Sequence, residues 1–175
     1  TFNGDLNFND VDGLTNMGTL FVDPTTTLTS DMTCNNLTID AGDTLVTDGY
    51  EIDCSGTITI NGTLDARDGT DGTSTISVGR NWSNNNLFLA GNSTVVFDGT
   101  TGSRSVTPGS SIYNNVLLNS SITYTLQDSM NVDGTLTLQA GTFDVSTSNH
   151  QISVAGNWIN TGATYTQRSG TVVFD

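Results

Sequence analysis

The chain has no lysine, and its 175 residues include only four arginines and one histidine against 18 aspartates and glutamates. The resulting formal net charge of −14 repels nucleic acid phosphates and anionic lipid headgroups, so we expect neither as a partner. Without lysine, this segment can form no lysine isopeptide cross-link and offers no lysine nucleophile. We interpret the acidity first as a source of solubility. Divalent cation binding and life in high salt are the functional alternatives.

Long apolar runs are missing as well. No stretch approaches the roughly 18–20 residues that span a membrane, and no long stretch repeats apolar residues at helical spacing. Hydrophobic residues make up 34% of the chain, which is low for a globular protein, but they are patterned and therefore not typical of disorder. We expect no membrane insertion, no substantial helix and a narrow core. Because the chain starts at Thr1 rather than at Met, we expect any signal peptide or anchor to lie outside it.

What the chain does contain is repetition. Three short motifs occur twice, as VGRNW (78–82) and VAGNW (154–158), TVVFD (94–98 and 171–175), and LTIDAG (37–42) and LTLQAG (136–141). Repetition of short strand-like units is typical of stacked, elongated architectures. The offset between copies is not constant, because the first copy carries an insertion from Thr57 to about Thr75. The insertion adds one complete unit of about 20–24 residues and leaves the pattern on both sides unchanged. This predicts coils of that length, and therefore about eight coils in the chain.

Local patterns indicate strands throughout. Segments such as 57–60 (TITI) and 135–138 (TLTL) alternate apolar with polar residues, which is the pattern of a half-buried strand. Glycine, asparagine and aspartate separate these runs and favour turns. The sequence therefore predicts an all-β fold, a parallel β-solenoid (β-helix) with short strands. An antiparallel β-sandwich is the alternative. Residues 1–175 form one continuous domain in this interpretation, with repeat cassettes of about 1–97 and 98–175.

The two ends of the chain share a motif. Thr1-Phe2-Asn3-Gly4 is similar to Val96-Phe97-Asp98-Gly99, and the chain stops at Val172-Val173-Phe174-Asp175. The segment thus begins and ends at about the same phase of its repeat, with no polar cap at either end. An uncapped solenoid end is an open sheet edge that invites further strands. We therefore expect self-assembly through residues 1–3 and 172–175, within a longer array or a head-to-tail polymer.

Cys34 and Cys54 are the only cysteines, and they lie about one coil apart. Stacked positions on parallel neighbours bring Cα atoms to about 4.8 Å, a separation that a disulfide accepts. We predict a disulfide between them, which is consistent with a secreted protein. Two buried thiols that act as small hydrophobic side chains are the alternative.

Asp65, Asp68 and Asp71 lie close together in a glycine-rich segment. Closely spaced carboxylates can bind Ca²⁺, which prefers several oxygen ligands. The segment lacks the full EF-hand pattern, and Arg67 lies among the candidate ligands, so a solvated acidic turn is the alternative. No other cofactor is expected.

Nothing in the sequence predicts an enzyme. His150 is the single histidine and has no nucleophile and acid arranged around it as in a hydrolase triad. Carbohydrate-active β-helices use clustered aspartates, or aspartate with lysine or arginine, whereas the aspartates here are scattered over turns. Trp82 and Trp158 occupy equivalent repeat positions, which favours a structural role. Threonine pairs such as Thr57 and Thr59 do not recur on every coil, so an ice-binding ladder is only a minor alternative.

The run from Asn36 to Leu45 (NLTIDAGDTL), followed by 56–64 (GTITINGTL), resembles the degenerate repeats of large secreted prokaryotic surface proteins. These are β-solenoid adhesins and filament, sheath or envelope proteins, broadly like filamentous haemagglutinins. The resemblance implies a non-enzymatic structural or adhesive protein at the cell surface, with copies of itself and cell-surface carbohydrate as the expected partners. A carbohydrate-binding or carbohydrate-active β-helix is the alternative function.

Overall fold

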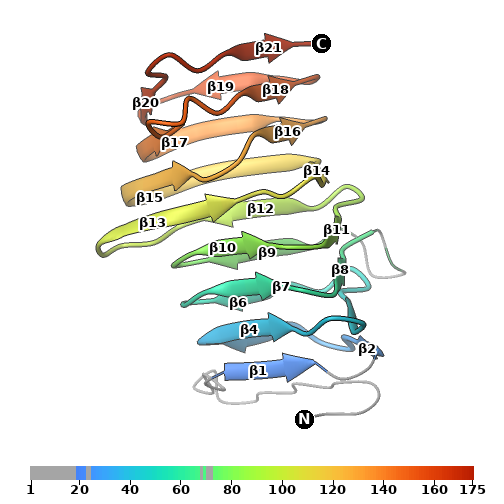
Figure 1. Ribbon diagram of the computed structural model, residues 1–175. Coiled ribbons are helices and arrows are strands. Elements are labelled where there is room, and N and C mark those ends of the chain that lie inside the picture. Colours follow the sequence, from blue (N-terminus) through green and yellow to red (C-terminus); the bar gives the residue numbers. More distant parts are fainter. Residues whose placement is uncertain (1–18, 23–24, 68, 70–72) are drawn as a thin grey trace.

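The computed structural model describes residues 19–22, 25–67, 69 and 73–175, and it is an all-β parallel solenoid without helices in this part of the chain (Figure 1). The predicted fold class is confirmed, and the β-sandwich alternative is excluded because every strand pair among these residues is parallel. The described coils make about seven turns. The predicted count of about eight was for all 175 residues, and residues 1–18 lie outside the described part.

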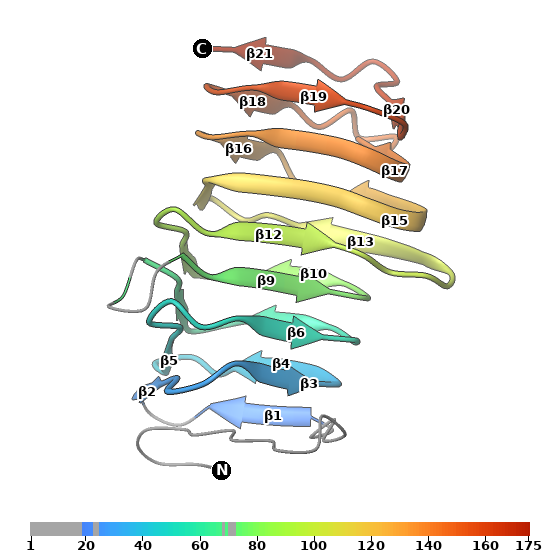
Figure 2. The same ribbon diagram turned by 180° about the vertical axis from the view of Figure 1, so that it is seen from behind.

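Each coil has three sides, and strands of successive coils stack to form three faces. The first face contains β1 (Thr19–Val22), β4 (Asn36–Ile39), β7 (Ile58–Ile60), β10 (Trp82–Asn84), β13 (Ser103–Thr107), the ends of β15 (Asn115–Leu126) and β17 (Leu136–Asp144), and β20 (Thr164–Thr166). The second face, seen in Figure 2, contains β3 (Met32–Cys34), β6 (Ile52–Cys54), β9 (Thr75–Val78), β12 (Thr94–Phe97), the starts of β15 and β17, and β19 (Trp158–Asn160).

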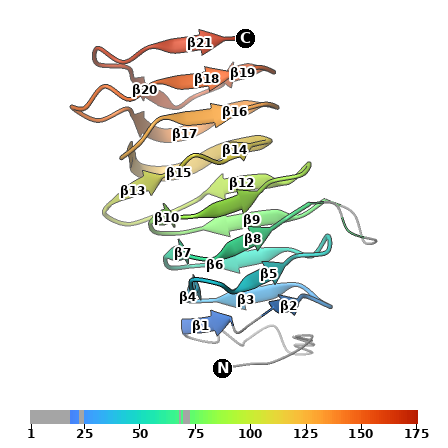
Figure 3. The ribbon, with the colours of Figure 1, turned by 45° about the vertical axis from the view of Figure 1, so that its right-hand side comes forward.

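The third face is divided into two sheets, and both are visible in Figure 3. One consists of β2 (Thr25–Thr27), β5 (Thr44–Val46), β8 (Thr63–Asp65) and β11 (Leu87–Leu89). The other consists of β14 (Ile112–Tyr113), β16 (Met130–Val132), β18 (Ile152–Val154) and β21 (Val172–Phe174). Strand pairing is continuous within each sheet but is interrupted between β11 and β14.

Side chains stack in register from coil to coil. In β4 and β7, for example, Leu37 lies over Ile58 and Ile39 over Ile60, and all four are completely buried. The residues between them point outward, so each strand alternates buried and partly exposed positions. A core of aliphatic and aromatic side chains therefore runs along the solenoid axis, and each coil covers the apolar side of the next.

Tight corners of the coil depend on glycine and asparagine. The Thr57 N–H donates to Asn36 Oδ1 of the coil below at 2.8 Å, and the Thr135 N–H donates to Asn115 Oδ1 at 3.0 Å. The glycine before each threonine lies against that asparagine pair. A Cβ on Gly134 would overlap Asn114 Oδ1, so a larger residue there would push the two coils apart.

The sequence repeat does not return to the same face. Trp82 begins β10 on the first face, whereas Trp158 begins β19 on the second face. Likewise the two TVVFD motifs form β12 on the second face and β21 on the third. The two copies thus have the same local structure but are displaced by one face around the axis. The interrupted pairing between β11 and β14 lies between the two halves.

Side chains replace strand pairing at this interruption. The Asn84 side-chain amide donates to the Pro108 carbonyl at 2.8 Å and to Ser111 Oγ at 3.0 Å. The Phe88 N–H donates to Ser111 Oγ at 2.9 Å. Inside the same coils, Trp82, Phe88 and Tyr113 form a buried aromatic cluster with ring centroids 5.2–5.9 Å apart. These bulky side chains fill the core beside the interruption.

Candidate functional site

The last coil leaves inward-pointing side chains uncovered. Trp158, Tyr165 and Phe174 stack on Leu136, Phe143 and Val154, which are fully buried one coil below. Phe174 is 66% exposed, and Trp158 and Tyr165 are partly exposed. Trp158 contacts Tyr165 and Phe174 edge-on, with ring centroids 4.9 and 6.2 Å away. We call Trp158, Tyr165, Val172 and Phe174 the end surface. The strand β21 lies at this end of the stack in Figure 1.

The backbone of the last coil is also open on one side. Among the described strands, β19, β20 and β21 pair only with the coil below. In that coil, the Leu136 N–H donates to the Asn157 carbonyl and the Ile152 N–H donates to the Thr171 carbonyl. Because side chains and hydrogen bonds repeat in register, Trp158 and Val172 direct their N–H groups toward the next coil position. The end surface therefore combines apolar side chains with an open parallel sheet edge.

Of the residues predicted to form the assembly ends, 172–175 belong to β21 and the residue after it. Val172 is partly buried, while Phe174 and Asp175 are exposed. Thr1, Phe2 and Asn3 lie outside the described residues.

Cys34 and Cys54 are opposite each other in β3 and β6 and form a disulfide, with their Cα atoms 4.8 Å apart. Both side chains are completely buried. The bond links two neighbouring coils on the second face and lies inside the core. It occupies a position where other stacked strands place a pair of aliphatic side chains. No free cysteine remains in the chain.

The calcium candidate is described only in part. Asp65, at the end of β8, accepts hydrogen bonds from the Arg67 guanidinium at 2.9 and 2.6 Å. This interaction holds the pKa of Asp65 below its usual value. Asp68 and Asp71 lie outside the described residues. Among the residues that are described, no group of three or more His, Cys, Asp or Glu side chains could hold a metal ion.

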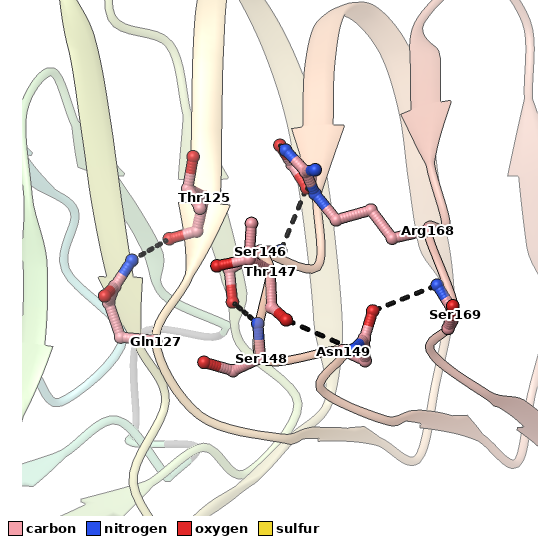
Figure 4. Close-up of polar contacts among 9 residues, drawn as sticks. Thr125, Gln127, Ser146, Thr147, Ser148, Asn149, Arg168 and Ser169 are labelled. Atoms are coloured by element: carbon pink, nitrogen blue, oxygen red, sulfur yellow. Dashed lines mark hydrogen bonds and ion pairs between the residues drawn. The ribbon is translucent and has the colours of Figure 1, made fainter.

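A second ion pair joins two coils at the corner shown in Figure 4. The Arg168 guanidinium donates two hydrogen bonds of 2.6 Å to the Asp144 carboxylate, which is almost buried at the end of β17. The pair lowers the pKa of Asp144. Beside it, Asn149 Oδ1 accepts the Ser169 N–H at 3.0 Å. Side chains thus join the two neighbouring coils at this corner, and we interpret the corner as structural.

Two surface hollows deserve comparison as candidate binding sites. The larger, about 390 Å³, lies on the third face and is lined by hydroxyl and amide groups with Asp128 as its single carboxylate. It contains no cationic side chain. The other, about 260 Å³, lies at the corner between the second and first faces and contains Asp53, Arg80 and Asp98. We call these three residues and their neighbours Ser55, Thr100 and Thr101 the charged hollow.

The charged hollow is assembled by three successive coils. Asp53 points outward from β6, Arg80 follows β9, and Asp98 follows β12. Partial burial raises the pKa of Asp98, and the nearby Asp53 carboxylate raises it further. Among the described residues Arg80 has no ion pair, whereas Arg67 and Arg168 each pair with an aspartate.

A buried tyrosine fixes the floor of the charged hollow. The Tyr124 hydroxyl donates to the Val78 carbonyl at 2.9 Å and accepts the Gly99 N–H at 3.0 Å. Burial raises the pKa of Tyr124 to about 12, so the phenol stays protonated at neutral pH. A Cβ on Gly99 would lie 2.6 Å from that hydroxyl, so only glycine fits at this point of the floor.

Sequence reasoning missed this site because its charged residues are far apart in the chain. In the sequence the aspartates are scattered over turns, and Arg80 stands out only as part of a repeated motif. The missing signal is the coil register, which pairs Phe97 with Val78 and so brings Asp98 beside Gly79, the residue before Arg80. Two aspartates rather than three line the hollow.

His150 lies in a turn, where its N–H donates to the Val145 carbonyl, and it joins neither hollow. In the part of the chain that the structure describes, no helix is long and apolar enough to cross a membrane.

The fold places the molecule in the class of parallel β-solenoid repeat proteins. No protein-family model, no curated protein and no solved structure compared with the chain matches it.

Proposed function

We propose that this chain is a structural or adhesive protein of the cell surface that builds a filament, sheath or stalk by coil-on-coil stacking. The observation that carries the proposal is the end surface, where side chains that are buried in every neighbouring coil are exposed beside an open sheet edge. A further coil, supplied either by a second copy or by the next coils of a longer array, would bury Trp158, Tyr165 and Phe174 and pair the backbone groups that are open here. The burial of large aromatic side chains is the main favourable term in such an interface.

An extracellular location is part of this proposal, and the disulfide supports it. A bond between Cys34 and Cys54 forms and persists in an oxidising compartment, whereas cytosolic thiols are kept reduced. The resemblance to filamentous-haemagglutinin-like repeats points in the same direction. The charge of −14 keeps lateral surfaces of neighbouring filaments apart, so it favours stacking at the ends.

The alternative function, a carbohydrate-binding or carbohydrate-active β-helix, draws support from the charged hollow. A groove lined by three or more acidic residues on one face would favour an enzyme, and the charged hollow has two with an arginine. We therefore retain binding, rather than catalysis, as the function of that hollow.

The stacking proposal is tested with Phe174→Asp, which places a charge in the centre of the end surface. The matched control is Ile159→Asp, because Ile159 is also exposed and apolar but points sideways from β19. We expect the unmodified chain to associate with rising concentration in light scattering and to form linear particles in electron microscopy. Phe174→Asp should abolish this association, and Ile159→Asp should retain it.

Circular dichroism melting curves establish that both variants remain folded. A compact monomer of the unmodified chain at every concentration would contradict the proposal. Equal loss of association in both variants would contradict it too, because stacking through the end surface predicts a difference.

A further inference from the structure

We propose that the charged hollow binds a neutral saccharide unit. The hollow brings two carboxylates, one guanidinium and three hydroxyl groups to the rim of a single depression of about 260 Å³. Its floor is bare because Gly79 and Gly99 have no side chains there. A concave surface with a few converging polar groups is the usual form of a small-ligand site.

The chemistry of the rim fits a polyhydroxylated ligand. Asp53 and Asp98 accept hydrogen bonds from sugar hydroxyls, and Arg80 donates to hydroxyl and ring oxygens. Thr100 and Thr101 can do either, and Ser55 Oγ, which donates to Asn35 Oδ1, can accept. Since each hydroxyl of a sugar is both donor and acceptor, one ring can bridge the carboxylates and the guanidinium without leaving either unpaired. Charged groups make stronger hydrogen bonds than neutral ones, which strengthens recognition at an exposed site.

The charge balance selects against acidic sugars. Two carboxylates outnumber the single guanidinium in the hollow, and the whole chain carries −14. A uronate would therefore be repelled despite Arg80. A divalent cation is the competing ligand, but a guanidinium beside the two carboxylates disfavours it, and Ca²⁺ prefers more oxygen ligands than the pair supplies.

The hollow is preorganised by the strands that carry it. Asp53 lies within β6, Asp98 directly follows β12, and Arg80 lies one residue further, after Gly79 at the end of β9. β9 and β12 pair in register over their whole lengths. The Tyr124 hydroxyl holds the floor through Val78 and Gly99. A rigid site loses little entropy when it binds, so a shallow depression can still select its ligand.

One sugar ring in an open hollow without an aromatic platform binds weakly, with an expected Kd of about 1–10 mM. If copies stack as proposed above, the hollow recurs along the filament, and a polysaccharide can bind several at once. The recognition of one sugar does not depend on that assembly, so the two proposals can fail separately.

The experiment is a titration followed by two-dimensional ¹H–¹⁵N NMR at a concentration where the chain is monomeric, with Phe174→Asp as background if needed. The probes are the methyl glycosides of glucose, galactose and mannose, with methyl galacturonoside as the acidic comparison. We expect saturable shifts at the amides of Gly79, Arg80, Gly99 and Thr100 with at least one neutral glycoside. Arg80→Ala and Asp53→Asn should each weaken binding at least fivefold.

Both substituted side chains are exposed, so the variants should fold normally. Arg67→Ala is the matched control and should bind as the unmodified chain does, because Arg67 is exposed and outside the hollow. Absence of saturable shifts at the hollow with all three neutral glycosides overturns the proposal. Tighter binding of the galacturonoside, or binding that requires added Ca²⁺, overturns it as well.

Discussion

At the residue scale, one of the two ion pairs in the described residues joins neighbouring coils. Asp144 and Arg168 are 24 residues apart in the chain, yet they make two hydrogen bonds of 2.6 Å at one corner. Arg168 has a φ of 52°, a conformation that is uncommon for residues other than glycine. The ion pair therefore helps to hold a turn that the backbone alone would not favour. By contrast, Asp65 and Arg67 lie in the same turn and link no coils.

Replacing Asp144 with Asn should lower the melting temperature at pH 7 by about 2–5 °C. The pKa of Asp144 is lowered in the folded chain, so its contribution is present above the unfolded pKa of about 3.9 and is lost as the pH falls through the folded value. The difference between the two proteins should therefore shrink below about pH 4 and vanish at the most acidic values. Melting curves from pH 2 to pH 7 measure it.

Asp65→Asn is the control for this experiment. Its partner Arg67 is 64% exposed and only two residues away, so the loss should be smaller. Equal effects of the two substitutions, or a difference for Asp144→Asn that persists at pH 2, would show that the link between coils is not the source of the stability.

At the scale of elements, the pairing of β3 with β6 is reinforced covalently. The disulfide closes a loop with a sequence separation of 20 and lies in a fully buried ladder position. In the chain-entropy picture, a loop of this size stabilises the folded state by roughly 3 kcal/mol. The first coils of the described part therefore depend on an oxidised bond in addition to their core.

Reduction should lower the free energy of unfolding by about 3 kcal/mol, as measured by urea unfolding with and without a reductant. Cys34→Ala/Cys54→Ala is the control, and its unfolding curve should not respond to the reductant. Mass spectrometry of the intact, unreduced chain should show a mass two hydrogens below that of the dithiol form. Free thiols on both residues would contradict the bond.

The arrangement of the strands also explains why the repeat is visible in the sequence although the two copies lie on different faces of the solenoid. The tight corner with Gly56 lies between the second and first faces, whereas the equivalent corner with Gly134 lies between the third and second. Each copy keeps its local hydrogen bonds, as Asn36 with Thr57 and Asn115 with Thr135 show. What changes is the side of the coil on which they lie.

At the scale of the whole molecule, repulsion within a net charge of −14 lowers the stability of the folded state. Salt screens like-charge repulsion over about 10 Å at 0.1 M. We expect the melting temperature to rise by about 3–6 °C between 20 mM and 500 mM NaCl, because relief of this repulsion outweighs the weakening of two ion pairs in the described residues. Calorimetry at a series of salt concentrations measures the rise.

Calcium at matched ionic strength provides the comparison. General screening predicts the same rise for CaCl₂ and NaCl, with no effect of EDTA on the dilute-salt sample. A larger rise with CaCl₂ that Asp65→Asn removes would instead support the calcium site suggested by Asp65, Asp68 and Asp71. A melting temperature that falls with NaCl would contradict the repulsion argument.

The sequence by itself determined the class of fold, because alternation within strands, turn residues and a gained unit of about 20–24 residues are local properties. It also predicted that Cys34 and Cys54 would meet, since their separation matches one coil. Only the tertiary structure decided which outward side chains become neighbours. Asp53, Arg80 and Asp98 converge because coils of unequal length are held in one register, and that register is set by core packing rather than by spacing along the chain. The exposure of Phe174 likewise depends on whether another coil covers it, and no local sequence pattern encodes that.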